Sequence, residues 1–257
     1  MRKALLASVS AIALGCSATV PARATPPTPM TWTGFYVGAN AGYAWGHSDT
    51  SLLHSAVGPP LFLSGTLADP PGLNPRGFIG GGQAGYNWQT GQWVFGGEVD
   101  FSGLSAKADA SISPFFTGKG PNTVTWASQY DWLFTARVRG GFLVVPNWLL
   151  YATGGLAVTH VRDSVTCTVP PGGNNDCINN PPFGNLNWSS SSTLTGGTFG
   201  GGVETMFAPN WTARAEYLYA KFQDTSPSST IPAVPPFFSF SHNLNIVRFA
   251  INYKFGG

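Results

Sequence analysis

Ten charged residues stand at alternating positions in segments that are otherwise apolar or small, and their side chains are the ones that could do chemistry. Five are acids and five are bases: Glu98, Asp100, Asp131, Glu204 and Glu216, with Arg137, Arg139, Arg214, Arg248 and Lys254. Carboxylates and bases in a confined space can form ion pairs, line a polar path for ions, or act as general acids and bases. The elements that carry them decide between these roles.

Eight segments alternate apolar residues with small or polar ones, and a period of two residues is typical of a β-strand with two different faces. We predict strands over residues 33–46, 77–89, 92–104, 127–144, 148–162, 193–207, 211–222 and 243–255. No proline falls inside these ranges, as a sheet without free edges requires. All ten charged residues take the parity opposite the apolar face of their strands, so we predict that they point into one shared interior.

The apolar face suits lipid, because a lysine or arginine facing lipid at mid-bilayer costs roughly 2 to 4 kcal/mol. A soluble barrel would instead place apolar residues inside and charges outside. Charged residues make up only 9% of the chain, yet no segment after the N-terminal one approaches the ~20 apolar residues of a transmembrane helix. The sequence therefore predicts an all-β protein, an eight-stranded antiparallel up-and-down transmembrane β-barrel.

Connections of two different lengths indicate how this barrel is oriented. Residues 90–92, 146–147 and 209–210 form tight turns, whereas residues 47–76, 105–126, 163–192 and 223–242 form long connections. Short periplasmic turns and long extracellular loops, with aromatic residues at the membrane interface, are typical of outer-membrane barrels. A tryptophan follows each tight turn and another opens the first strand, so we predict four periplasmic interface aromatics: Trp32, Trp93, Trp148 and Trp211.

The N-terminal segment reads as an export signal. Arg2 and Lys3 precede an apolar stretch, and Ala22-Arg23-Ala24 is an A-x-A cleavage site, so we predict a cleaved signal peptide over residues 1–24. A proline-rich tail over residues 25–31 and the barrel over residues 32–257 would follow. A lipoprotein-type cleavage before Cys16 is an alternative. Without the signal, ten lysines and arginines face eleven acids, and nothing suggests a nucleic-acid partner.

The remaining cysteines, Cys167 and Cys177, lie ten residues apart in one long connection. In an exported protein this spacing predicts a loop disulfide, with two free thiols as the alternative. Two sulfurs without further ligands nearby do not predict a metal site. Glycine runs such as Gly80-Gly81-Gly82 precede no helix and carry no P-loop lysine, so we predict no cofactor and read the glycines as relief of crowding in a narrow barrel.

The chain resembles a known group of proteins in three places: residues 32–38 (WTGFYVG), residues 151–157 (YATGGLA) and the terminal Tyr253-Lys254-Phe255. It is similar to the small alphaproteobacterial outer-membrane immunogenic or opacity-type porin-family barrels, which are related to the OmpA transmembrane domain. The resemblance implies location in the Gram-negative outer membrane. It also implies insertion by the barrel-assembly machinery, with Tyr253 and Phe255 as the assembly signal.

Eight strands enclose an interior that side chains can just fill, so the ten charges most simply pair and plug it. We therefore expect a monomeric structural protein, in contact with outer-membrane lipids, that contributes to envelope integrity and displays surface loops. A small porin with a continuous polar path is the alternative. A lipid-modifying enzyme is a third hypothesis, in which His160, Asp163 and Ser164 would act near the outer rim, but three groups at one strand end rarely converge. We predict no catalytic residue.

Overall fold

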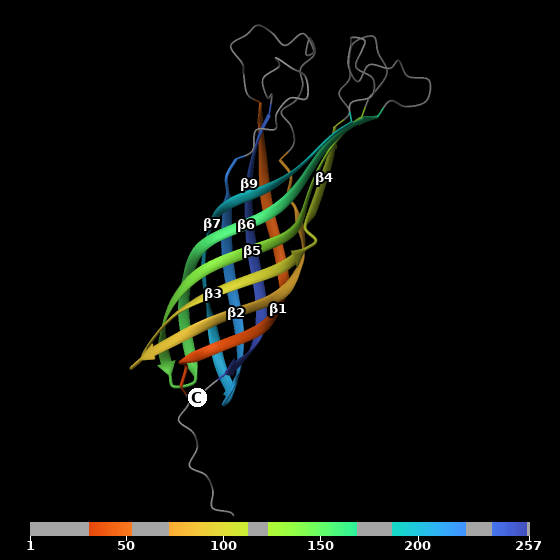
Figure 1. Ribbon diagram of the computed structural model, residues 1–257. Coiled ribbons are helices and arrows are strands. Elements are labelled where there is room, and N and C mark those ends of the chain that lie inside the picture. The colour runs from red at the N-terminus through yellow and green to blue at the C-terminus, as the bar shows by residue number, and fades with distance from the viewer. Residues whose placement is uncertain (1–30, 53–71, 113–122, 169–186, 225–237, 256–257) are drawn as a thin grey trace, which may run out of the picture.

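The computed structural model describes residues 31–52, 72–112, 123–168, 187–224 and 238–255, which form a single antiparallel sheet wrapped into a barrel (Figure 1). Its strands are β1 (Gly34–Leu52), β2 (Arg76–Thr90), β3 (Trp93–Leu104), β4 (Lys107–Ile112), β5 (Thr123–Val145), β6 (Trp148–Thr168), β7 (Asn187–Ala208), β8 (Trp211–Phe222) and β9 (Phe238–Phe255). Within these ranges, no helix has the length and hydropathy needed to cross a membrane.

The sheet closes because β1 pairs with β2 on one side and with β9 on the other. β3 and β4 both pair with β5 and follow one another along it, so together they make one position in the wall. The result is a closed eight-stranded antiparallel barrel, which confirms the predicted fold class. In the closed wall each strand pairs with a neighbour on both sides, and among sheets only a closed one satisfies its backbone in lipid.

Three hairpins connect their strands with two residues each: β2 to β3, β5 to β6, and β7 to β8. In the first of these, Gly91 has φ of +59°, a left-handed conformation that glycine adopts without steric strain. We call the end of the barrel that carries these turns the turn end, and the opposite end the loop end.

Five strands extend four residues or more farther toward the loop end than their sequence pattern predicts: β1, β5, β6, β7 and β9. β7, for instance, begins at Asn187 and not at residue 193, and β9 begins at Phe238. The serine run over residues 189–192 continues the ladder with β6 but contains no apolar residue, so its sequence carries no two-faced pattern. In this run, backbone pairing with β6 extends the strand without side-chain alternation.

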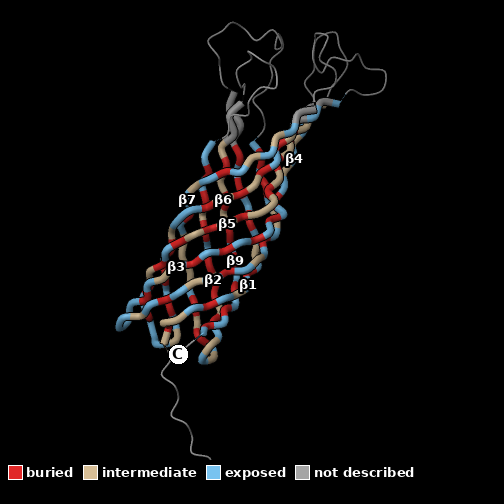
Figure 2. Tube along the Cα trace, in the orientation of Figure 1, coloured by how far each residue is buried: buried red, intermediate tan, exposed pale blue. Residues whose placement is uncertain are grey.

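The two faces of the wall differ as the alternation predicts, and buried and exposed residues alternate along each strand (Figure 2). On β8 the pattern alternates over all twelve residues. Large apolar side chains cover the outer face, for example Phe78 at 75% exposure and Val138 at 72%. An apolar outer face of this extent is expected where the surrounding solvent is lipid.

One irregularity changes which residues face inward. The pairing of β5 with β6 shifts between Tyr130 and Trp132, where β5 carries one extra residue. Tyr130 and Leu133 are both fully buried, although they differ in parity. Such a β-bulge turns the following side chains to the opposite face. Inward positions on β5 are therefore even up to Tyr130 and odd from Leu133 onward.

The barrel interior as the candidate functional site

Glu98 on β3 lies at the centre of the interior charge network. Arg214 donates to both of its carboxylate oxygens, at 2.6 and 3.2 Å, and Arg137 Nη2 donates to its Oε1 at 2.5 Å. The hydroxyl of Tyr36 donates to its Oε2 at 2.6 Å. All of these groups are buried, and charge-assisted hydrogen bonds of this kind compensate the loss of hydration.

Asp100 and Glu216 share two arginines. Arg137 donates to Asp100 Oδ2 at 3.0 Å and to Glu216 Oε1 at 3.0 Å. Arg248 donates to Asp100 Oδ1 at 2.9 Å and to Glu216 Oε2 at 2.8 Å. These contacts tie β3, β5, β8 and β9 together through the lumen, so each arginine balances more than one carboxylate.

A second pair lies nearer the turn end. Arg139 Nη2 donates to Glu204 Oε2 at 2.6 Å, and Thr212 and Asn252 donate to the other oxygen at 2.6 and 3.0 Å. The guanidinium of Arg139 also lies 4.1 Å from the ring centroid of Tyr151, a cation–π contact. The Tyr151 hydroxyl donates to Glu216 Oε1 at 2.8 Å, which joins this pair to the larger network.

Apolar side chains lie on both sides of this charged layer. Toward the turn end is a lower layer: Trp32, Val94, Leu143, Leu149, Tyr151 and Met206. Toward the loop end is an upper layer: Ala44, Ile79, Leu104, Ala106, Tyr130, Leu133, Ala157, Val161, Leu194, Leu218, Ala220, Phe222, Leu244 and Ile246. On β8, for example, Glu216 is followed by Leu218 and Phe222. Sequence reasoning missed both layers, although their residues have inward parity.

Nine of the ten charges predicted to face inward are buried in the interior: Glu98, Asp100, Arg137, Arg139, Glu204, Arg214, Glu216, Arg248 and Lys254. Eight of them belong to the contacts described above. The ninth, Lys254, lies near the turn end, where its Nζ is 3.5 Å from the carbonyl oxygen of Thr33.

The prediction that Asp131 faces the interior is wrong. Its Oδ2 lies 2.8 Å from Arg162 Nε in an ion pair, and the Arg162 side chain is 62% exposed on the outer face. Gln129 donates to the same carboxylate, at 2.9 Å. The cause is the bulge between Tyr130 and Trp132, which places Asp131 outside although its parity matches the interior residues that follow.

The prediction that Trp32 is an interface aromatic is also wrong, because its side chain is only 1% exposed. Its indole Nε1 donates to the carbonyl oxygen of Pro146 at 3.1 Å, and its backbone nitrogen donates to Gln89 Oε1 at 2.8 Å. Gly34 follows with φ of +143°, where the chain bends into β1. Trp32 thus covers the turn end from inside. Its even number, shared with inward-facing Tyr36, was a signal available in the sequence.

The other three tryptophans of this set lie on the outer face at the turn end. Trp93, Trp148 and Trp211 are 53%, 44% and 44% exposed. Trp93 packs edge-on against Phe142, with ring centroids 5.3 Å apart, and Trp211 packs against Tyr253 at 5.1 Å. Together they form part of a girdle of aromatic side chains around the barrel.

The three residues of the enzyme hypothesis do not converge. His160 stacks on Trp132 on the outer face, with centroids 6.2 Å apart, whereas Asp163 is buried in the interior. A different cluster lies inside the loop end, where the Tyr130 hydroxyl is 2.9 Å from His242 Nδ1 and His242 Nε2 is 3.9 Å from Asp163 Oδ2. Its members come from β5, β6 and β9, so no local sequence motif predicts this cluster.

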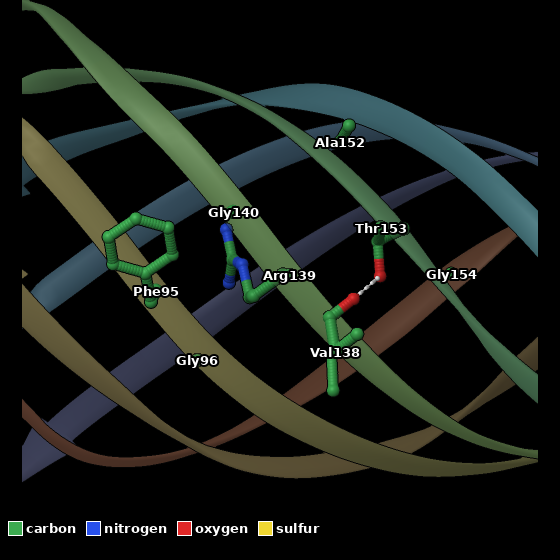
Figure 3. A pocket seen from close by; sticks show the side chains of 8 residues that line it. All are labelled: Phe95, Gly96, Val138, Arg139, Gly140, Ala152, Thr153 and Gly154. Carbon is green, nitrogen blue, oxygen red and sulfur yellow. Dashed lines mark hydrogen bonds between the residues drawn. The ribbon is translucent and has the colours of Figure 1, made fainter.

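A shallow depression lies on the outer face over β3, β5 and β6 (Figure 3). Gly140, Ala152 and Gly154 leave space there beside Phe95 and Val138. The Arg139 side chain belongs to the interior network, and the Thr153 hydroxyl donates to the Val138 carbonyl at 2.9 Å. The outward lining is apolar, so it offers no polar groups with which to bind a cofactor. Among the residues that the structure describes, no three His, Cys, Asp or Glu side chains are placed to hold a metal ion.

Several predictions fall outside the described residues. These are the signal peptide, Cys16, nearly all of the proline-rich tail, and Cys177 with its predicted disulfide. The backbone of Cys167 belongs to β6, but its side chain is also outside the description.

A closed barrel with an apolar outer face and a charged interior defines the class of transmembrane β-barrel proteins. Residues 8–246 match the family described as outer membrane protein beta-barrel domain, and the chain belongs to this family. It is therefore an outer-membrane β-barrel protein.

Curated relatives agree with this assignment. The chain is 32% identical to the 31 kDa outer-membrane immunogenic protein of Brucella melitensis, over 99% of this chain and 100% of the relative. It is 28% identical to a 22 kDa outer membrane protein of Rhizobium leguminosarum, over 91% and 83% of the two chains. Among solved structures, the outer membrane protein OprG of Pseudomonas aeruginosa is 14% identical, with coverage of 88% and 97% and a TM-score of 0.42.

Proposed function

We propose that this protein is a structural component of the outer membrane that contributes to envelope integrity and displays surface loops, with a lumen closed to solutes. The observation that carries the proposal is the stacking of the interior: a layer of paired charges lies between two apolar layers.

The physical chemistry of those layers supports a closed lumen. A solute that crosses the upper layer meets buried side chains such as Leu133, Leu218 and Leu244, which offer no hydrogen bonds in exchange for its hydration shell. Beyond them it would have to separate ion pairs that cross the lumen, such as Arg214 with Glu98. Four arginines and four carboxylates balance in that layer, so it presents no excess charge to attract a counter-ion.

Planar-bilayer recording tests this proposal against the porin alternative. Purified protein should add no discrete channels to the bilayer, while a known porin in the same bilayer provides the positive control. Discrete, reproducible channels from the folded protein would overturn the closed lumen.

Labelling of single cysteines gives a second readout. In a background without native cysteines, Ile246→Cys in the upper layer should resist a water-soluble thiol reagent, because this position is fully buried. Ser105→Cys, at an exposed position near the loop end, should react readily. Comparable labelling of the two variants would mean that water reaches the lumen.

The proposed contribution to envelope integrity is tested in whole cells. A deletion strain should become more sensitive to detergents, and the wild-type gene should restore resistance. Epitope tags inserted within residues 172–175 should be accessible on intact cells if that connection is displayed at the surface. Equal detergent resistance with and without the gene would argue against the structural role.

We further propose that the barrel inserts through the barrel-assembly machinery and remains a monomer among outer-membrane lipids. Support for the assembly signal is that Tyr253 and Phe255 both face outward on β9, the strand that closes the barrel against β1.

We infer no catalytic activity, because His160 and Asp163 face opposite sides of the wall. Lipid profiles of cells with and without the protein would reveal a lipid-modifying activity.

A further inference from the structure

Three bases project from the outer face of the barrel near the loop end. Arg76 begins β2, Lys107 begins β4, and Arg162 lies in the last third of β6; all three are exposed. Among the described residues with assigned exposure, the only other base on the outer face is Lys221 on β8. The remaining described bases belong to the interior.

The three bases belong to one cross-strand row. Arg76 is the direct register partner of Lys107, Lys107 that of Gln129, and Gln129 that of Arg162. Neighbouring strands lie about 4.7 to 4.9 Å apart, so the row brings three positive side chains together on four adjacent strands. We call Arg76, Lys107 and Arg162 the basic row.

The pairing of Arg76 with Lys107 is electrostatically unfavourable within the protein alone, because like charges directly opposite one another on a sheet repel. Among the described residues, neither base forms an ion pair. Among the strand residues with assigned exposure, two acids lie on the same outer face: Asp109, two residues along β4, and Asp131, which forms an ion pair with Arg162 Nε. The row therefore keeps an excess of positive charge.

Outward-facing aromatic side chains fix the height of the basic row in the membrane. Trp45 is the register partner of Arg76 on β1, and Phe78 follows Arg76 by two residues toward the turn end. On β6, Arg162 lies two residues beyond His160, which stacks on Trp132. Aromatic girdles mark the boundary between the acyl region and the headgroups, so the row lies at headgroup level.

We propose that the basic row binds the phosphate groups of anionic lipid headgroups in the outer leaflet. An arginine guanidinium can donate two parallel hydrogen bonds to a phosphate, and a lysine supplies a compact charge beside it. A phosphate over the row would remove the repulsion between Arg76 and Lys107. Short turns face the periplasm in outer-membrane barrels, so the loop end lies in the outer leaflet.

Lipid titration of the full-length protein tests the proposal. The probe is diphosphorylated lipid A with a fluorescent acyl chain, titrated into protein held in neutral detergent micelles. Arg76→Gln and Lys107→Gln should each raise the apparent Kd about fivefold, as expected for one surface charge at an anionic lipid. Replacing all three bases by glutamine should raise it roughly a hundredfold.

Lys221→Gln is the matched control, because Lys221 is an exposed base on β8 whose register partners, Gly197 and Asn243, carry no charge. It should leave the apparent Kd unchanged. Dephosphorylated lipid A should bind wild type and the triple variant equally. The proposal is overturned if Lys221→Gln weakens binding as much as Arg76→Gln, or if the triple variant binds like wild type.

Thermal unfolding adds a readout that does not depend on a labelled lipid. In nanodiscs of neutral phosphatidylcholine, Lys107→Gln should unfold at the same or a higher temperature than wild type, since the repulsion is relieved. In nanodiscs containing lipid A, wild type should be the more stable protein. Inorganic phosphate alone should not raise the unfolding temperature; if it did so as strongly as lipid A, the row would be a free-phosphate site and the lipid proposal would fail.

Discussion

Arg214 on β8 and Glu98 on β3 form a bidentate ion pair across the full width of the barrel, with distances of 2.6 and 3.2 Å. β3 and β8 lie four strands apart in either direction around the wall. The pair therefore joins the two halves of the barrel through the lumen, which backbone hydrogen bonds between neighbouring strands cannot do. Glu98 also accepts a hydrogen bond from Arg137 on β5. The loss of this one carboxylate would therefore leave the buried guanidinium groups of Arg137 and Arg214 with less negative charge to balance them.

Glu98→Ala should lower the free energy of unfolding by about 3 to 5 kcal/mol, because removing one partner leaves buried charge uncompensated. Unfolding in urea from neutral vesicles, followed by tryptophan fluorescence, measures the change. Val99→Ala, on the outer face of the same strand, is the control and should change stability by about 1 kcal/mol or less. A loss below that of the control would mean that the network does not support the fold.

Trp32 should be shielded from lipid, in contrast to Trp93, Trp148 and Trp211. In variants that each retain one of these four tryptophans, lipids with brominated acyl chains should quench the latter three and leave Trp32 nearly unaffected. The reason is that Trp32 is buried under the turn end, while the others are 44 to 53% exposed. Quenching of Trp32 to the same degree would contradict its buried position and place it at the membrane interface.

Asp131 and Asp100 should respond very differently to replacement by asparagine. Asp131→Asn removes a partly exposed pair with Arg162, so the expected loss of stability is about 1 kcal/mol or less and shrinks with added salt. Asp100→Asn weakens buried contacts with Arg137 and Arg248, and should lose several times more. Urea unfolding at low and high salt compares them. Equal losses would contradict the outward placement of Asp131.

Two glycine positions should differ in their tolerance of alanine. A Cβ at Gly42 would lie 2.2 Å from the carbonyl oxygen of Val247 and 2.7 Å from the Cα of Arg248, both backbone atoms of β9. Gly42→Ala should therefore reduce the folded, heat-modifiable form on electrophoresis. Gly82→Ala is the control, because its nearest neighbour would be a backbone oxygen at 3.7 Å. Normal folding of both variants would mean that β1 and β9 can separate at that point.

Phe255→Ala should lower the amount of protein inserted into the outer membrane, because the assembly machinery is expected to read an outward aromatic at the end of the last strand. Phe249→Ala removes an outward aromatic in the middle of the same strand and should insert normally. Fractionation of cells that express each variant at equal levels gives the comparison. The proposed signal fails if the two variants insert equally.

Much of the architecture follows from the sequence because a strand has a period of two. Alternation identified all eight barrel positions, and the tight turns predicted at residues 90–92, 146–147 and 209–210 identified the hairpins. Parity alone assigned nine buried charges to the interior, since every unbroken strand keeps its faces along its whole length. Where the ladder is regular, the local sequence is sufficient to predict which side chains face the interior.

Parity failed for Asp131, where the ladder is irregular. One extra residue on β5 reverses the faces, and this insertion is visible only against the partner strand. The Tyr130–His242–Asp163 cluster was missed for a related reason, because His242 on β9 meets Tyr130 on β5 and Asp163 on β6 only after the barrel closes.

The sequence by itself determined that this chain forms a two-faced, closed sheet in a membrane, because alternation and the exclusion of charge from lipid act residue by residue. Tertiary structure alone decided which charges pair, as Arg214 does with Glu98, and that apolar layers enclose them. Those outcomes depend on the stagger of the strands around the barrel, which sets the height at which each side chain enters the lumen. Stagger is a property of all eight strands together, so no single segment of the sequence encodes it.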